Sequence, residues 1–381
     1  MGIIRTAFFL VGTTIGAGFL TGAELVRFFP GRGYLPAFAF SCVLFGVANA
    51  FFLCLGKKYG GCAGAMRALF GRAARPVMCL LLAVAFVPCS GMLAGLDALF
   101  PDVRPFASIA GLAVIVLFLS RGMKGVSFLN LLLVPVLFLC VLLSGKGFGT
   151  VLAPRAGEIG HAALYAAMNI AFSAPALMDA GRTAHAPVRA SVLAAGAVFL
   201  CGALVLGGIY VTGDAALNAS MPYLAVMRGS GLFFAAAACA VMTSLASALF
   251  PLFSACERFA GRKKNAAKAA VLLAAFLLSR LGLDGVIQLL YPSAGAFGAL
   301  FSAVCIFDEY FFQQYYKRIH SRRQKAEDKG RAHYKVEFEH LSAVHDEVSQ
   351  PCARNNVFAH DRADPRHADV DLEHRNDGGV G

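Results

Sequence analysis

The chain has 381 residues, of which 58% are hydrophobic and 15% are charged. Soluble domains carry about 25% charged residues, so this composition excludes an ordinary soluble protein and predicts a polytopic membrane protein. The formal net charge of +12 arises entirely before residue 317, because segment 317–381 has twelve basic and twelve acidic residues. Loop topology accounts for such a charge better than nucleic-acid binding. Eleven cysteines without any C-x-x-C pair predict neither a zinc site nor a disulfide framework.

Ten apolar runs predict an all-α membrane domain over residues 1–316, because a chain of this composition crosses a bilayer as helices. The runs are 4–29, 34–55, 76–100, 105–119, 125–144, 159–180, 188–212, 230–256, 266–281 and 285–312. The composition changes after Tyr316. We expect segment 317–381 to be a polar cytoplasmic tail that is largely disordered.

The distribution of basic residues among the loops predicts the orientation. With ten spans, one side of the membrane receives twenty lysines and arginines and the other receives seven. The positive-inside rule then places both termini in the cytoplasm.

The first run contains a glycine-rich stretch, 12–22, with four glycines and three threonines. Each glycine weakens a helix by about 1 kcal/mol relative to alanine. A broken spanning helix is tolerated where its backbone is buried in protein or faces a watery cavity, so the stretch predicts a discontinuous helix beside a solute site. The pairs Gly12/Gly16 and Gly18/Gly22 also fit the G-x-x-x-G pattern of close helix packing, which is the alternative interpretation.

The sixth run carries comparable signals. Pro175 removes a backbone hydrogen bond, and Asn169 and Ser173 share one helical face. Interrupted helices at corresponding positions of two halves point to the binding site of a secondary transporter. The alternative is that proline and glycine are common in membrane helices generally.

Hydroxyl groups and one carboxyl group are further candidates for binding or carrying the coupling ion. Thr243, Ser244 and Ser247 of the eighth run offer oxygens suited to Na⁺, although such hydroxyls often bond to carbonyls of their own helix. Glu24 is a candidate carrier of a coupling proton; its alternative is an ion pair with Arg27, three residues later.

Residues 11–25, V-G-T-T-I-G-A-G-F-L-T-G-A-E-L, resemble the first helix of the YkvI-type bacterial membrane proteins, whose pattern is roughly G-T-x-I-G-A-G-F-A-S-G-Q-E. Residues 164–170 are similar to that family's L-Y-x-x-x-N-I segment, and 221–224 to a later part. The family resembles a branch of the amino acid–polyamine–organocation superfamily. The resemblance implies the LeuT fold, with five plus five helices as an inverted repeat and discontinuous helices 1 and 6.

The resemblance also implies specific binding residues. Na⁺ would be held by Gly12, Ile15, Ala240, Thr243 and Ser244. The solute would be bound by Thr14, Gly16, Ala17, Gly18, Asn169 and Ser173, with the amides near Gly16 to Gly18 holding a carboxylate. Phe19 departs from the asparagine of sodium-coupled amino-acid symporters, which argues against a second sodium site. The fifth run lacks the lysine of some proton-coupled relatives, which favours Na⁺.

We therefore expect a secondary transporter of a small, amino-acid-like solute in the bacterial plasma membrane, in contact with lipids, needing no cofactor besides Na⁺ as coupling ion. The alternative is a non-transporting receptor or sensor on the same fold. The chain lacks H-E-x-x-H and G-x-S-x-G motifs, so we do not expect an enzyme. The sequence does not determine the oligomeric state.

Overall fold

The computed structural model describes residues 1–31, 33–144, 147, 155–219, 221–227 and 230–328. The chain divides into two units, Met1–Tyr315 and Tyr316–Gly381, of which the first holds the site. The expected tail begins inside a helix that continues to Asp328, and the rest of the tail lies outside the described residues.

The described residues form helices and no strand, in agreement with the expected all-α class. The α-helices are α1 (Ile3–Thr14), α2 (Ala17–Leu20), α3 (Ala23–Phe28), α4 (Tyr34–Tyr59), α5 (Cys62–Phe70), α6 (Ala74–Leu99), α7 (Phe106–Leu119), α8 (Gly122–Ser144), α9 (Ala156–Gly181), α10 (Pro187–Thr212), α11 (Asp214–Leu217), α12 (Pro222–Met227), α13 (Gly231–Phe259), α14 (Lys264–Leu278), α15 (Gly282–Leu289) and α16 (Tyr291–Asp328). Short 3₁₀ turns join several of them.

Six helical segments of the described chain are long and apolar enough to cross a membrane. They are residues 34–59, 62–99, 122–143, 187–212, 231–259 and 291–311. The helices α1 and α7 are apolar but shorter. The chain is thus a multi-pass membrane protein, and the count of ten spans stays a prediction.

The predicted break in the sixth run is wrong, because α9 is one uninterrupted helix around Pro175. The Asn169 side-chain amide donates to the Tyr165 carbonyl at 3.0 Å, and the Ser173 hydroxyl donates to the Asn169 carbonyl at 2.7 Å. Every residue from 168 to 181 is buried, so a break here would leave backbone N–H and C=O groups without hydrogen-bond partners among packed side chains. The polar side chains therefore bond within α9 instead of marking a gap.

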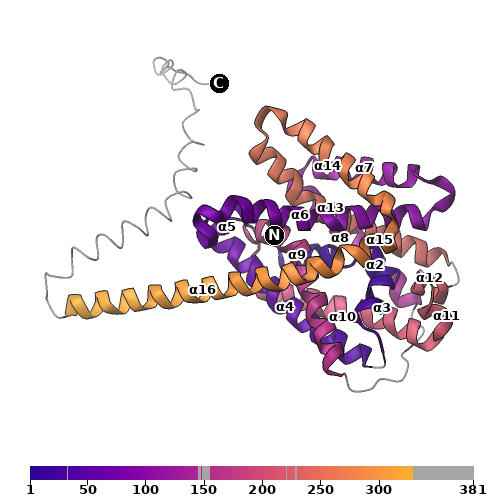
Figure 1. Cartoon of the computed structure of the whole chain (residues 1–381), viewed down its shortest axis with the longest axis horizontal. Coiled ribbons are helices and arrows are strands. Elements are labelled where there is room, and N and C mark those ends of the chain that lie inside the picture. Colours follow the sequence, from indigo (N-terminus) through magenta and orange to yellow (C-terminus); the bar gives the residue numbers. More distant parts are fainter. Residues whose placement is uncertain (32, 145–146, 148–154, 220, 228–229, 329–381) are drawn as a thin grey trace, which may run out of the picture. The chain divides into compact units, whose positions relative to one another are not determined.

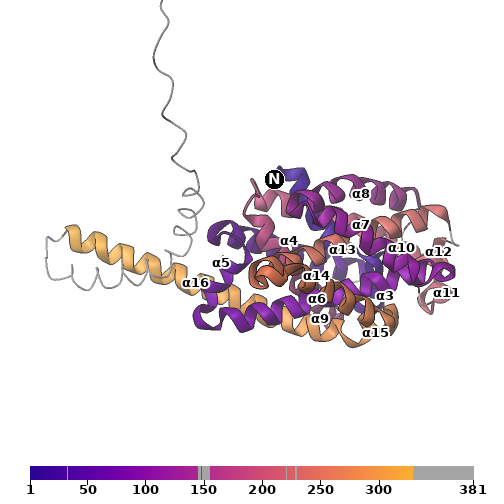
Figure 2. The same cartoon turned by 90° about the horizontal axis from the view of Figure 1, so that it is seen from above.

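The helix ends gather into two groups, as the predicted alternation of loops requires. At one end, the α5 amide of Cys62 donates to the Asp179 carboxylate of α9 at 2.9 Å, and Lys58 pairs with Glu309 at 2.7 Å. At the other end, the Tyr210 hydroxyl of α10 donates to the Phe29 carbonyl at 2.6 Å. Figures 1 and 2 show α5 and the N-terminus at one end of the first unit and α11 and α12 at the opposite end.

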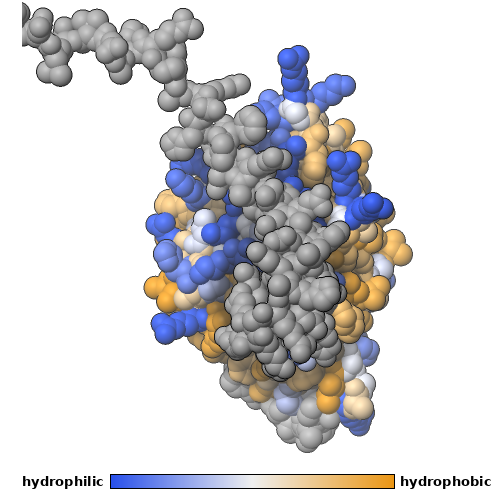
Figure 3. All heavy atoms as spheres, turned by 90° about the vertical axis from the view of Figure 1, so that its left-hand side faces the viewer, coloured by the Kyte–Doolittle hydropathy of each residue, from blue (hydrophilic) through white to orange (hydrophobic). Residues whose placement is uncertain are grey.

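The end that carries α5 is the one that the basic loops predict to be cytoplasmic. Figure 3 looks onto this end and shows hydrophilic side chains over it, with hydrophobic ones on its flanks. Its exposed basic residues include Lys57, Lys58, Arg67, Arg72, Arg75, Arg182, Arg258, Arg262, Lys263 and Lys264. This clustering agrees with the charge count, and the orientation itself stays a prediction.

Close helix packing fixes the position of α9 against α4. A Cβ atom on Gly56 would lie 1.9 Å from the Met178 carbonyl oxygen, and one on Gly181 would lie 2.2 Å from that of Leu53. The two helices therefore approach with glycine backbone in contact, as small residues allow in membrane helices.

We expect Gly56→Ala to lower the stability of the folded protein by about 2 kcal/mol or more, because the new methyl group overlaps backbone that cannot rotate away. Gly196→Ala is the matched control, since nothing lies within 4 Å of its Cβ position. Thermal unfolding of both variants in detergent tests this. Equal melting temperatures for the two variants would contradict the close contact.

Candidate functional site

The first predicted run is divided into α1, α2 and α3, which confirms the predicted break. Ile15 (φ −84°, ψ 93°) and Gly16 (φ −112°, ψ −165°) are extended. Gly22 ends the next short helix with φ +81°, a conformation that favours glycine. Because the chain leaves the helix after Thr14, carbonyl groups of the last turn of α1 have no amide partner in their own helix.

A serine of α13 provides the missing hydrogen-bond donor. The Ser244 Oγ atom lies 2.7 Å from the Gly12 carbonyl oxygen and 2.9 Å from that of Ile15, and it donates to them. Thr243 lies alongside, because a Cβ on Gly12 would be 3.2 Å from the Thr243 Cβ. The Thr243 hydroxyl donates to the Ala240 carbonyl at 3.0 Å. The five residues predicted to hold Na⁺ thus lie together, although their role as ligands stays a prediction.

The alternative interpretation of the α13 hydroxyls holds in part. Thr243 also bonds to the Cys239 carbonyl at 2.9 Å, and Ser247 bonds to the Thr243 carbonyl at 2.8 Å, so both satisfy their own helix. Ser244 bonds across to the broken helix instead.

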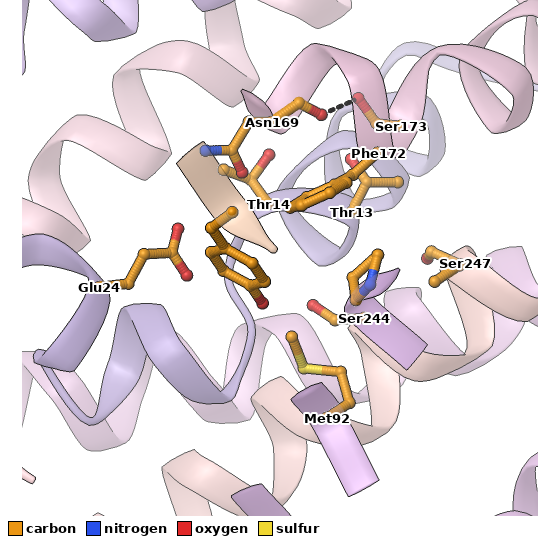
Figure 4. Close-up of a pocket in the computed structure, with 12 residues that line it drawn as sticks. Thr13, Thr14, Glu24, Met92, Asn169, Phe172, Ser173, Ser244 and Ser247 are labelled. Carbon is orange, nitrogen blue, oxygen red and sulfur yellow. Dashed lines mark hydrogen bonds between the residues drawn. The ribbon is translucent and has the colours of Figure 1, made fainter. Parts of the chain in front are cut away.

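A buried pocket lies beside the break, between α1, α3, α6, α9, α13 and α16 (Figure 4). The space between its lining atoms is about 420 Å³ when the open solvent at its mouth is counted. It is lined by Thr13, Thr14, Glu24, Pro88, Met92, Asn169, Phe172, Ser173, Ser244, Ser247, Ala248 and Tyr291.

Three of the residues predicted to bind the solute line this pocket: Thr14, Asn169 and Ser173. Gly16, Ala17 and Gly18 do not. The Ala17 amide points at the Met92 sulfur, at 3.2 Å. A Cβ on Gly18 would lie 2.7 Å from the Glu24 carboxylate, so this glycine packs against a side chain instead of opening onto the cavity.

Glu24 is buried, with 4% of its surface exposed, and its carboxyl group faces the pocket (Figure 4). The predicted pairing with Arg27 is not formed: Arg27 is exposed and its guanidinium group donates to the Gln288 carbonyl at 3.5 Å. Among the described residues no ion pair involves Glu24.

Asn130 of α8 is a residue that the sequence analysis did not identify. It is fully buried, and its Oδ1 atom has no hydrogen-bond partner in the structure. A Cβ on Gly12 would lie 1.9 Å from this oxygen, so Asn130 presses against α1 at the start of the break. The sequence analysis searched the fifth run only for lysine and so did not identify Asn130. The signal that could have identified it is a single carboxamide side chain within an apolar span.

No family model matches the chain. It is 25% identical over 335 residues to the uncharacterized membrane protein YkvI of Bacillus subtilis (strain 168), a match covering 76% of this chain and 91% of YkvI. Similar solved structures agree with the helix arrangement. Mhp1, a nucleobase-cation-symport-1 family transporter with bromovinylhydantoin bound, superimposes with a TM-score of 0.56 at 15% identity, covering 76% of this chain and 75% of that one.

Two further structures are similar. MhsT in complex with L-phenylalanine has a TM-score of 0.59 at 15% identity, covering 79% of this chain and 87% of its own. A Na⁺-coupled sialic acid symporter has a TM-score of 0.57 at 12% identity, covering 79% and 76%. The chain resembles YkvI and has the LeuT fold. The resemblance to the YkvI-type proteins expected from residues 11–25 is confirmed.

The contact between Gly12 and Asn130 provides a test of this site. We expect Gly12→Ala to destabilise the protein by about 1–3 kcal/mol, because the methyl group must displace a buried carboxamide. Asn130→Ala in the same chain should recover part of that loss by removing the obstructing atoms. The measurement is a double-mutant cycle of unfolding free energies. Additive effects of the two substitutions would show that the residues are not in contact.

Proposed function

We propose that this protein is a secondary active transporter that moves a small, amino-acid-like organic solute by alternating access, with Na⁺ as the coupling ion. The observation that carries the proposal is the contact of Ser244 with the free carbonyl groups of Gly12 and Ile15 beside a buried pocket. Discontinuous helices of transporters bind ions and solutes at such unwound backbone.

The chemistry of the oxygens supports a cation. Na⁺ is a hard cation and prefers carbonyl and hydroxyl oxygens, which Gly12, Ile15, Ala240, Thr243 and Ser244 would supply. Ser244 now donates its hydrogen to two carbonyl oxygens, so it would turn that hydrogen away to offer a lone pair. The ion would then take the place of the hydroxyl hydrogen between α1 and α13.

The unpartnered Oδ1 atom of Asn130 is a second reason to propose a cation here. An unsatisfied buried acceptor costs about 1–3 kcal/mol and calls for an explanation such as an ion or a water molecule. Its position against Gly12 puts this oxygen on the α8 side of the same group of residues.

The proposed transport cycle uses ten membrane spans in two repeats of five, with both termini and the twenty basic residues of the richer side in the cytoplasm. Cation binding would hold the broken first helix against α13, and release of the ion would free it to move. The solute would occupy the pocket lined by Thr14, Asn169 and Ser173.

The deciding experiment is solute flux in proteoliposomes containing the purified full-length chain. The proposal expects uptake that requires an inward Na⁺ gradient. Solute binding without flux would favour a membrane receptor, and flux driven equally well by a proton gradient without Na⁺ would reject Na⁺ as the coupling ion.

Thr243→Ala should raise the Na⁺ concentration for half-maximal uptake about tenfold, which corresponds to about 1.4 kcal/mol of binding free energy. The control is Thr212→Ala, because Thr212 makes the same bond to a carbonyl four residues earlier, at 2.9 Å, outside the pocket. An unchanged Na⁺ dependence in Thr243→Ala would remove this residue from the proposed site.

Asn130→Asp should make stability depend more steeply on Na⁺. A buried carboxylate without a partner is unfavourable, whereas one beside Na⁺ is neutralised. We expect a lower melting temperature than wild type in choline chloride and a larger rise on exchange into sodium chloride. Equal sodium-dependent shifts in the two proteins would contradict a role for Asn130 at the cation site.

A further inference from the structure

The five serine and threonine hydroxyl groups that line the pocket all donate their hydrogens to backbone carbonyl groups. Thr13 and Thr14 donate to the Leu10 carbonyl at 2.6 and 3.1 Å. Ser173 and Ser247 donate to carbonyls of their own helices, at 2.7 and 2.8 Å. Ser244 donates to the carbonyls of α1. Since a hydroxyl has one hydrogen, each of these groups presents only acceptor lone pairs to a ligand.

Among the nitrogen donors near the pocket, the Ala17 amide and one of the two Asn169 Nδ2 hydrogens already have partners. The Asn169 side-chain amide donates to the Tyr165 carbonyl at 3.0 Å, and the Ala17 amide points at the Met92 sulfur. None of the described lining residues is a lysine, arginine or histidine. Apart from the Tyr291 hydroxyl and the second Asn169 N–H, the described lining offers oxygen acceptors and no cationic side chain, which opposes the binding of an anionic group.

Glu24 adds a carboxyl group to this acceptor-rich surface. It is the one acidic side chain among the described lining residues, and none of the ion pairs between described residues involves it. A buried carboxylate without a counter-ion is strongly unfavourable, so an ionisable side chain within a membrane domain marks a functional site whose partner must be named.

Aromatic rings lie in the same cavity. The rings of Phe172 and Tyr291, both of which line the pocket, meet edge to face with centroids 5.1 Å apart. In Figure 4 the Glu24 carboxyl group and Ser244 lie on different sides of the cavity. Aromatic faces attract ammonium groups, with about 2 kcal/mol available when the cation is desolvated.

We propose that the group recognised in this pocket is an ammonium group of the solute, with Glu24 as its counter-ion, and that the solute carries no net negative charge. This inference rests on the proposed transport function and narrows its substrate class to small primary or secondary amines and zwitterions. The ammonium hydrogens meet the carboxylate and the lone pairs of the pocket hydroxyls. A carboxylate on the solute is tolerated instead of recognised, so a decarboxylated amine binds at least as tightly as the parent amino acid.

The test measures binding of four matched probes to the purified full-length chain by calorimetry in sodium chloride. The probes are leucine, 3-methylbutylamine, 4-methylpentanoate and the neutral 3-methyl-1-butanol, with linear amines of one to six carbons to cover size. We expect an amine of this series to bind at least about 100-fold more tightly than 4-methylpentanoate. Tighter binding of the acid or the alcohol, or no binding by any amine, would overturn the proposal.

Glu24→Gln provides the second measurement. It should raise the dissociation constant of the best amine at least about tenfold and leave that of the alcohol unchanged. Glu257→Gln, an exposed carboxyl outside the pocket, is the control for a change in total charge. Equal amine affinity in Glu24→Gln and wild type would reject Glu24 as the counter-ion, and the probe series in wild type decides the ligand class even without this variant.

The two proposals fail in different ways. Na⁺-driven uptake of an acidic solute would reject the ammonium preference and leave transport standing. Tight amine binding without flux would reject transport and leave the ligand class standing.

Discussion

The structure depends on how the carbonyl groups released by the break in α1 are satisfied. Inside a membrane no water is available to them, so each must find a partner in the protein. The Ser244 hydroxyl supplies that partner for Gly12 and Ile15 and thereby links α1 to α13. A single hydroxyl hydrogen serves two carbonyl oxygens here, which is a weak substitute for a cation. This geometry is the basis of the proposed cation site.

Two kinds of polar group meet around this break. Hydroxyl and carbonyl oxygens lie where α1 meets α13, and the Glu24 carboxyl group faces the pocket from α3. A site with oxygen acceptors on both sides and no basic residue among its described lining is better suited to positive than to negative ligands. The proposed coupling ion and the proposed ammonium group would each supply part of it. Under this view, the ion and the solute stabilise neighbouring parts of one unwound segment.

The contrast between α1 and α9 shows how glycine and proline differ as helix breakers. Glycines and the extended Ile15–Gly16 peptide interrupt α1, where Ser244 donates to the freed Gly12 carbonyl and the Met92 sulfur accepts from the Ala17 amide. Around Pro175 the neighbouring Asn169 and Ser173 side chains form hydrogen bonds within α9. The one backbone hydrogen bond that proline cannot make therefore does not break the helix. Close contacts at Gly56 and Gly181 then hold α9 straight against α4. Sequence alone could not distinguish these outcomes, because both runs combine polar residues with weak helix formers.

The amino-acid sequence by itself determined the membrane class and a helix break within residues 12–22. These follow from apolar length and glycine content, which are local properties, whereas the grouping of Thr243 and Ser244 with the first run came from the resemblance to the YkvI-type proteins. Only the tertiary structure decided which hydrogens are already used, that Arg27 points away from Glu24, and that Asn130 meets Gly12. The contacts of Ser244 with Gly12, of Arg27 with Gln288 and of Asn130 with Gly12 each join residues more than a hundred positions apart, so no local pattern encodes them.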